Sequence, residues 1–181
     1  IPDGYYQELD PTDIENLKAW VVEGGTLIGT QTGSHWIINK KIINEKIKKT
    51  ENMKLDIAYD QLGNVTGAQR IGGAIFEVEL DNTHPIAFGY NKKASIFRRG
   101  THFFELSVAP SANVGRYSND PLVSGYISEE KTAEIKNTAS IIARRQGRGH
   151  VVLFADNPSF RAFWYGTDGL LLNAIFFGQA F

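Results

Sequence analysis

The stretch from Gly147 to Phe181 constrains the fold of this chain most strongly. After a glycine-rich turn, the apolar run Val151–Phe154 has the length and the β-branched residues of one buried strand. A polar loop follows, and the mostly apolar segment Leu170–Phe177 predicts a closing helix that Gly178 can end. A buried strand, a polar loop and a buried helix in this order are typical of the end of an α/β domain.

The first part of the chain also predicts a helix and a strand of the kind found in α/β domains. Asp10 can cap a helix whose first residue is Pro11, and Gly24-Gly25 can end it. The short apolar run Thr26–Thr30 then predicts a strand. Because this run and Val151–Phe154 both lead into a polar turn and a helix, we predict that they are parallel strands of one sheet.

The middle of the chain predicts short strands at close spacing, which favours antiparallel additions to that sheet. The expected strands are Ala74–Leu80, Ile86–Tyr90, Ala94–Phe97, His102–Val108, Pro121–Ile127 and Thr138–Arg145, with the last in a hairpin with Val151–Phe154. The segment Ser34–Lys49 predicts an amphipathic surface helix with a break. The segment Thr50–Gln69 predicts a long irregular connection. Ser128 is expected to cap a short helix.

Composition excludes several classes of function. The 181 residues suffice for one domain. The net charge of −1 does not indicate a nucleic-acid-binding protein. The pairs Arg98-Arg99 and Arg144-Arg145 are therefore expected on solvated faces. No apolar run approaches the roughly 20 residues of a membrane helix. Cysteine is absent, which excludes disulfides, thiol catalysis and cysteine-based metal sites.

The turn after Thr26–Thr30 carries the most informative spacing. Gly29, Gln31 and Gly33 follow the glycine-x-nucleophile-x-glycine pattern, which places a nucleophile on a sharp turn between a strand and a helix. The central residue is a glutamine, and a carboxamide has neither a nucleophilic oxygen nor an ionisable thiol. The sequence therefore predicts an elbow that has kept its shape without covalent chemistry.

A hydrolase or transferase that uses Ser34 is the enzymatic alternative. Ser34 and His35 follow the elbow, and Asp156 follows the later strand. Adjacent helical residues point about 100° apart, so Ser34 and His35 are poorly placed as partners, and His84 or His150 would have to complete the set. The simpler interpretation is that Ser34 caps the helix.

His102 and Glu105 have the His-x-x-Glu spacing of two zinc ligands. In a strand, residues three apart point to opposite faces, and a zinc site needs at least three convergent ligands. His84 and His150 are no better placed as a third ligand, so we expect no metal in this chain.

The loop after Val151–Phe154 holds a cluster of polar and aromatic residues: Asp156, Asn157, Arg161, Trp164 and Tyr165. One interpretation is a site for a small molecule, glycan or peptide, with Arg161 as an anion anchor and Trp164 as a stacking surface. The other is that Asp156 and Arg161 form an ion pair that fixes the loop while the aromatic rings fill the core.

Four stretches together resemble one known family. They are Leu17–Trp36, Leu80–Tyr90, Pro121–Glu130 and Phe154–Gly178, and they resemble the C-terminal domain of bacterial zinc carboxypeptidases, which is related in fold to class I glutamine amidotransferases. The resemblance implies a three-layer, flavodoxin-like α/β domain with a mixed central sheet and an antiparallel insertion between about Gly73 and Val108. In the amidotransferases the residue at the position of Gln31 is cysteine.

The resemblance also implies a role and a setting. The chain would be a non-catalytic accessory domain, zinc and peptidase activity would belong to a separate catalytic domain, and the parent protein would be exported to the periplasm or the medium. The segment Ile1–Tyr6 opens as if it followed a core strand, so we expect one or two βα units before it. A domain cut at this point is expected to self-associate through the exposed edge or to bind the missing part.

Overall fold

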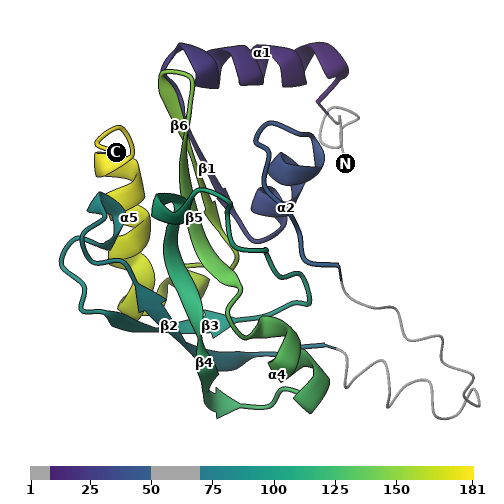
Figure 1. Ribbon diagram of the computed structural model, residues 1–181, viewed down its shortest axis with the longest axis vertical. Helices are drawn as coiled ribbons and strands as arrows, with labels where there is room; N and C mark the ends of the chain where they lie inside the picture. Colours follow the sequence, from purple (N-terminus) through teal and green to yellow (C-terminus); the bar gives the residue numbers. More distant parts are fainter. Residues whose placement is uncertain (1–8, 50–69) are drawn as a thin grey trace, which may run out of the picture.

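The computed structural model describes residues 9–49 and 70–181. The expectations for Ile1–Tyr6 and Thr50–Gln69 lie outside the described residues. A mixed sheet with the strand order β1-β6-β5-β4-β2-β3 forms the centre of the described part (Figure 1). Its strands are β1 (Thr26–Thr30), β2 (Ala74–Leu80), β3 (Lys93–Arg98), β4 (Asn113–Gly125), β5 (Ala139–Gln146) and β6 (Gly149–Phe154).

The predicted parallel pair is confirmed. β1 runs parallel to β6, with Thr26 opposite His150 and Thr30 opposite Phe154, and the other pairings in the sheet are antiparallel. The apolar run in each strand therefore ends at the same edge of the sheet, where the chain turns into polar loops.

Helices cover both faces of the sheet. They are α1 (Pro11–Glu23), α2 (Thr32–Asn39), α4 (Glu129–Ile135) and α5 (Asp168–Phe177). Val151 and Leu153 of β6 pack in one core cluster with residues of α1 and α2, whereas Val152 and Phe154 pack in a second cluster with residues of α5. α2 and α5 accordingly lie on opposite sides of the strands (Figure 1). The predicted three-layer α/β class with a mixed sheet is confirmed.

The start of α1 is also confirmed. The Asp13 backbone N–H donates to Asp10 Oδ1 at 2.9 Å, and the Asp10 N–H donates to Asp13 Oδ2 at 3.1 Å, so the two carboxylates satisfy each other's backbone donors. The helix ends at Gly24, whose φ of 134° is a conformation that glycine adopts without steric cost. No helix among the described residues combines the length and apolar character that a membrane crossing requires.

Most of the predicted antiparallel strands are present. β2 has the predicted bounds, β3 extends the predicted Ala94–Phe97 by one residue at each end, and β5 and β6 form the predicted hairpin. β4 begins well before the predicted Pro121. Its pairing with β2 shifts register between Phe76 and Val78, and Pro121 lies within this irregularity, where a missing N–H is tolerated.

The prediction of a strand at Ile86–Tyr90 is wrong. Pro85–Ala87 forms a short 3-10 helix, η2, because His84 caps it: the Ile86 N–H donates to His84 Nδ1 at 3.2 Å. The local hydrogen bond replaces a strand pairing.

The prediction of a strand at His102–Val108 is also wrong. Only Phe104 forms β-bridges there, with Ile47 on one side and Ala139 on the other. The aromatic residues that suggested a strand are buried individually, with Phe103 and Phe104 in different core clusters.

The amphipathic helix predicted from Ser34 is shorter than expected. α2 ends at Asn39, and Lys41 has a φ of 54°, which turns the chain. Ile42 and Ile43 are nevertheless buried, so their apolar character serves a turn that packs under the sheet and not a second helical segment.

Candidate functional site

The turn between β1 and α2 has the backbone of a nucleophile elbow. Gln31 has φ 45° and ψ −115°, a sparsely populated region for a residue with a Cβ atom. Its N–H donates to the Phe154 carbonyl at 3.0 Å, which extends the parallel pairing of β1 and β6 by one residue. The predicted elbow is present, with a strained residue at its centre.

Close packing explains why the first position of the elbow is a glycine. A Cβ atom at Gly29 would lie 2.9 Å from the backbone N and Cα of Ser34, so α2 could not approach the strand so closely. At Gly33 a Cβ atom would meet nothing within 4 Å. Only one of the two spacing glycines is therefore required by packing.

A pocket of about 680 Å³ opens above the elbow, at the carboxyl ends of β1, β3 and β6. It is lined by Gln31, Thr32, Arg70, Ile71, Gly72, Arg98, Arg99, Gly100, Thr101, His102, Ala155 and Phe160. Three of these residues are arginines and none is a carboxylate. The pocket lies where open α/β sheets most often bind ligands.

Ser34 does not face this pocket. Its side chain is fully buried, and its hydroxyl donates to the Phe154 carbonyl at 2.9 Å, so it fastens α2 to β6. The prediction that Ser34 caps the helix is wrong, because the N-cap residue is Gln31 and no side chain bonds to that end. A hydroxyl held in this way is a poor candidate for the nucleophile of the hydrolase alternative.

Two histidines stack beside the elbow. The rings of His35 and His102 lie 4.3 Å apart between centroids, and Asn39 Nδ2 donates a hydrogen bond to His35 Nδ1 at 3.0 Å. Partial burial and the neighbouring His102 lower the pKa of His35. In the described residues no three histidine, aspartate or glutamate side chains gather as a metal site would require.

A buried ion pair supports the floor of the pocket. Arg98 Nη1 donates to Asp156 Oδ1 at 2.7 Å and to the Tyr117 hydroxyl at 2.9 Å, and Arg98 Nη2 donates to the His102 carbonyl. The Tyr117 hydroxyl donates to the other carboxylate oxygen of Asp156. Burial raises the pKa of the Asp156 carboxyl, and the Arg98 guanidinium counteracts this rise.

This ion pair corrects two predictions. Asp156 pairs with Arg98 and not with Arg161, and Arg98, which was expected on a solvated face, is 1% exposed. Arg161 is exposed and lies over the ring of Phe160, with its guanidinium carbon 5.5 Å from the ring centroid.

The other residues of the predicted loop cluster point in separate directions. Asn157 Oδ1 accepts from the Ser159 N–H at 3.1 Å and so closes its own turn. Trp164 Nε1 donates to the Ser95 carbonyl of β3 at 3.3 Å, and Tyr165 is 77% exposed. The aromatic residues therefore do not fill the core as one interpretation expected, and none of the five predicted residues is among those that line the elbow pocket.

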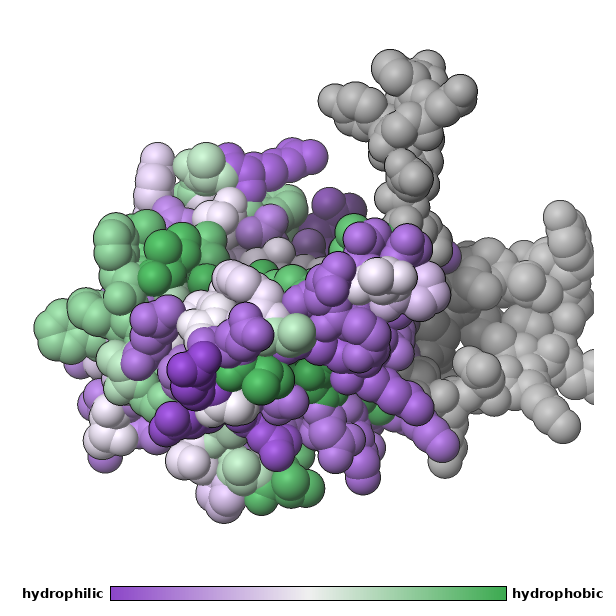
Figure 2. Space-filling model, turned by 90° about the horizontal axis from the view of Figure 1, so that it is seen from above, coloured by the Kyte–Doolittle hydropathy of each residue, from purple (hydrophilic) through white to green (hydrophobic). Residues whose placement is uncertain are grey.

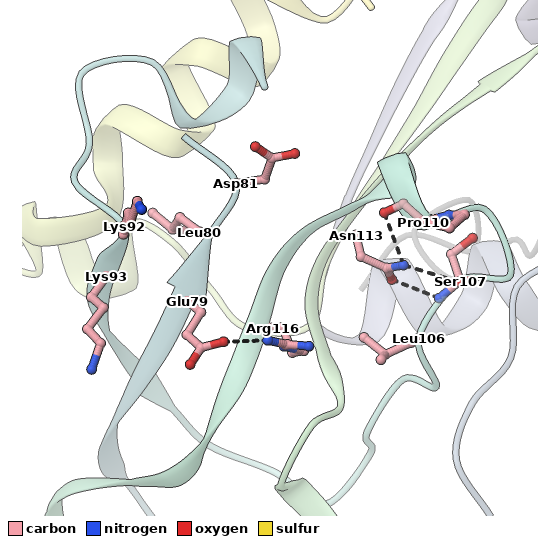
Figure 3. Close-up of a pocket in the computed structure, with 10 residues that line it drawn as sticks. All are labelled: Glu79, Leu80, Asp81, Lys92, Lys93, Leu106, Ser107, Pro110, Asn113 and Arg116. Carbon is pink, nitrogen blue, oxygen red and sulfur yellow. Dashed lines mark hydrogen bonds and ion pairs between the residues drawn. The ribbon is translucent and has the colours of Figure 1, made fainter. Parts of the chain in front are cut away.

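A second hollow of about 650 Å³ lies near the far ends of β2 and β4 (Figure 3). Two of its charged residues pair with each other: Glu79 and Arg116 form an ion pair at 2.6 Å, and Asn113 bonds to the loop that contains Ser107. Both charged partners are about half exposed, and acids and bases are mixed. This hollow is a weaker candidate for a binding site than the elbow pocket.

No protein-family model and no curated protein matches this chain. Several solved structures resemble it, including the following two. A protein described as ThuA-like from Bacteroides uniformis is 11% identical with a TM-score of 0.48, and the match covers 95% of this chain and 65% of the other. A cytoplasmic protein from Salmonella typhimurium is 14% identical with a TM-score of 0.44, over 97% and 64%. The chain thus spans less than two thirds of either, and likenesses this distant carry no argument about function.

Proposed function

We propose that this chain is a non-catalytic accessory domain of an exported zinc metallocarboxypeptidase, and that its elbow pocket binds a small carboxylate. The observation that supports the first part is Gln31 at the centre of an otherwise intact elbow. The Ser34 hydroxyl, which the hydrolase alternative would use as the nucleophile, is buried and hydrogen-bonded to the backbone. The arrangement favours binding without covalent chemistry.

The proposed parent rests on the four stretches that resemble the C-terminal domain of bacterial zinc carboxypeptidases. In such a protein the catalytic domain holds the zinc ion and cleaves the peptide, and this domain packs against it or binds substrate. An exported or periplasmic location follows from the same resemblance. The elbow pocket then offers a place to hold a peptide near the catalytic domain.

The charge of the pocket supports a carboxylate as its ligand. Arg98 is neutralised by Asp156, but Arg70 and Arg99 are exposed, and the described residues that line the pocket include no carboxylate. The Arg99 Nε donates to the Gly72 carbonyl at 3.1 Å, which leaves its terminal nitrogens for a ligand. A guanidinium binds a carboxylate through two parallel hydrogen bonds, and every peptide substrate of a carboxypeptidase ends in a free carboxylate.

Binding of one short peptide as its free acid and as its C-terminal amide tests the ligand. We expect the free acid to bind at least about tenfold more tightly, the effect of about 1.4 kcal/mol. Arg99→Gln should weaken binding of the acid and remove most of the difference. Arg148→Gln, which removes the same charge from the exposed β5–β6 turn, is the control. Equal affinities for the two peptides would reject the carboxylate ligand and leave the accessory role standing.

Activity assays test the proposal that the domain is non-catalytic. The chain alone is expected to hydrolyse neither glutamine nor peptides. Turnover that is lost in Gln31→Ala while the thermal unfolding temperature is unchanged would contradict a non-catalytic elbow.

A further inference from the structure

The helix α5 is apolar on nearly every side. Leu170 and Ala174 are buried against the sheet, yet Leu172, Ile175 and Phe176 on the outer side are 51%, 57% and 76% exposed. A helix that is apolar all round is normally buried all round. The outer side of α5 is thus left uncovered by residues 9–49 and 70–181 of a single copy.

The uncovered surface continues onto the neighbouring turn. Phe88 is 69% exposed, and its ring lies 5.9 Å from that of Phe177. Asn173 Nδ2 donates to the carbonyls of Ile86 and Phe88 at 2.9 and 2.8 Å, which fastens this turn to the helix. We call the exposed set the α5 face; it comprises Phe88, Leu172, Ile175, Phe176 and Phe177. Hydrophobic residues gather on this side of the molecule, where Figure 1 draws α5 (Figure 2).

The size of the α5 face suits an interface between two copies. Its five side chains are 40% to 76% exposed. At about 150–250 Å² for each large side chain, the face presents on the order of 500 Å² of apolar surface. This is near the upper end of the patches found on monomeric proteins, and two such faces together reach the roughly 1,000 Å² of a specific interface.

We propose that the chain forms a two-fold symmetric homodimer through the α5 face, a surface independent of the elbow pocket and of the proposed function. Leu172, Ile175 and Phe176 are spaced at i, i+3 and i+4, so they form one stripe along the helix. When two copies of α5 pack antiparallel, a two-fold axis level with position 174, next to Ile175, sets Leu172 of one copy beside Phe176 of the other. The stripe is thus complementary to itself, as a two-fold interface requires.

The chemistry of the face favours a second copy over a different protein. None of its five residues is charged. Complementary charges add specificity between unlike partners, and the five residues of this face supply none. Two identical copies need no such pairing, because symmetry aligns the same apolar side chains and brings no like charges together.

Sedimentation equilibrium from about 1 to 200 µM tests the proposal, since the expected dissociation constant is in the micromolar range. The wild-type chain should dimerise with rising concentration. Phe176→Glu should raise the dissociation constant at least about 100-fold, because it places two carboxylates in the apolar interface. Tyr165→Glu adds the same charge at an aromatic residue that is 77% exposed outside the face, and it should leave the dimer unchanged.

The position of the symmetry axis has its own test. The chain has no cysteine, so Ile175→Cys introduces the only thiol. Mild oxidation should convert this variant to a disulfide-linked dimer, and Tyr165→Cys should stay unlinked at the same concentration. A wild-type chain that is monomeric at every concentration, or equal effects of Phe176→Glu and Tyr165→Glu, would overturn the proposal.

Discussion

The backbone of Gln31 shows how a single residue retains the shape of a reactive turn. Its φ of 45° and ψ of −115° bring a strain of the order of 1–3 kcal/mol, which the surrounding contacts must offset. The Phe154 carbonyl provides two of those contacts, since it accepts hydrogen bonds from the Gln31 N–H and the Ser34 hydroxyl. The elbow is therefore held by β6 and α2 and not by the side chain at its centre.

Replacing Gln31 with glycine tests this strain. Gln31→Gly should raise the free energy of unfolding by up to about 1 kcal/mol, because glycine adopts this conformation without strain. The greater entropy of glycine in the unfolded chain offsets part of the gain. The matched control is Thr32→Gly, which places glycine at the first residue of α2 and should lower the free energy by about 0.5–1 kcal/mol. Urea denaturation gives both values. Equal losses in the two variants would mean that Gln31 is not strained.

Residue spacing predicts the elbow but not the ion pair beneath it. The glycine pattern around Gln31 is local and can be identified in the sequence, whereas Asp156 pairs with Arg98, which is 58 positions away. One local signal does exist, because Arg98 follows Ala94 and Ile96 at period two and so belongs to the buried row of β3. An arginine in such a row needs a buried carboxylate, but nothing local identifies Asp156 as its partner.

Among the elements, those with a clear period were predictable. β2 alternates apolar and polar residues along its whole length, and its bounds could be predicted from the sequence. The segments at Ile86–Tyr90 and His102–Val108 are equally apolar but carry no ladder of backbone hydrogen bonds. Their residues are buried one at a time by contacts with distant segments, such as the bridges from Phe104 to Ile47 and Ala139. Apolar composition alone therefore does not distinguish a strand from an apolar segment that is buried without forming one.

Gly149 brings the β5–β6 hairpin into close contact with α1 and the residues that follow it. A Cβ atom at Gly149 would lie 2.0 Å from the Val21 carbonyl oxygen and 2.3 Å from that of Gly25. Gly149→Ala should therefore lower the free energy of unfolding by more than about 2 kcal/mol, because neither backbone can move without displacing α1 from the sheet. Thermal denaturation followed by circular dichroism measures the loss.

Gly33→Ala is the control for this clash. A Cβ atom there meets nothing within 4 Å, and the residue lies in α2, so the change should be neutral or slightly stabilising. A Gly149→Ala variant as stable as Gly33→Ala would show that α1 packs less tightly than the structure indicates.

At the scale of the whole molecule, the sheet joins the two ends of the sequence. β1 and β6 pair in parallel although they lie more than 100 positions apart, and the antiparallel strands between them extend the sheet on one side only. The elbow pocket lies at one edge of this sheet, and the α5 face lies on a helix that covers one of its faces. Binding at one of these sites therefore does not obstruct the other.

The stability of the whole molecule is expected to fall in mild acid because of His84. This side chain is 9% exposed, its Nδ1 accepts the hydrogen bond that caps η2, and its ring lies 4.5 Å from that of Phe181. Burial lowers the pKa of His84 below the ordinary 6.5, and the nearby Asp81 only partly opposes this. The folded chain thus holds the ring neutral, while the unfolded chain takes up a proton once the pH falls below 6.5.

Urea denaturation at several values between about pH 7 and pH 5 should show a free energy of unfolding that declines as the pH falls, since the unfolded state binds the extra proton in this window. His84→Asn keeps a short side chain that can accept the Ile86 N–H bond but removes the titrating ring, so its profile should be flatter. His35, whose pKa is also lowered, contributes in the same direction, whereas the raised pKa of Asp156 contributes in the opposite direction. Parallel profiles for the wild type and His84→Asn would show that the fold does not depend on a neutral His84, whatever the absolute stabilities.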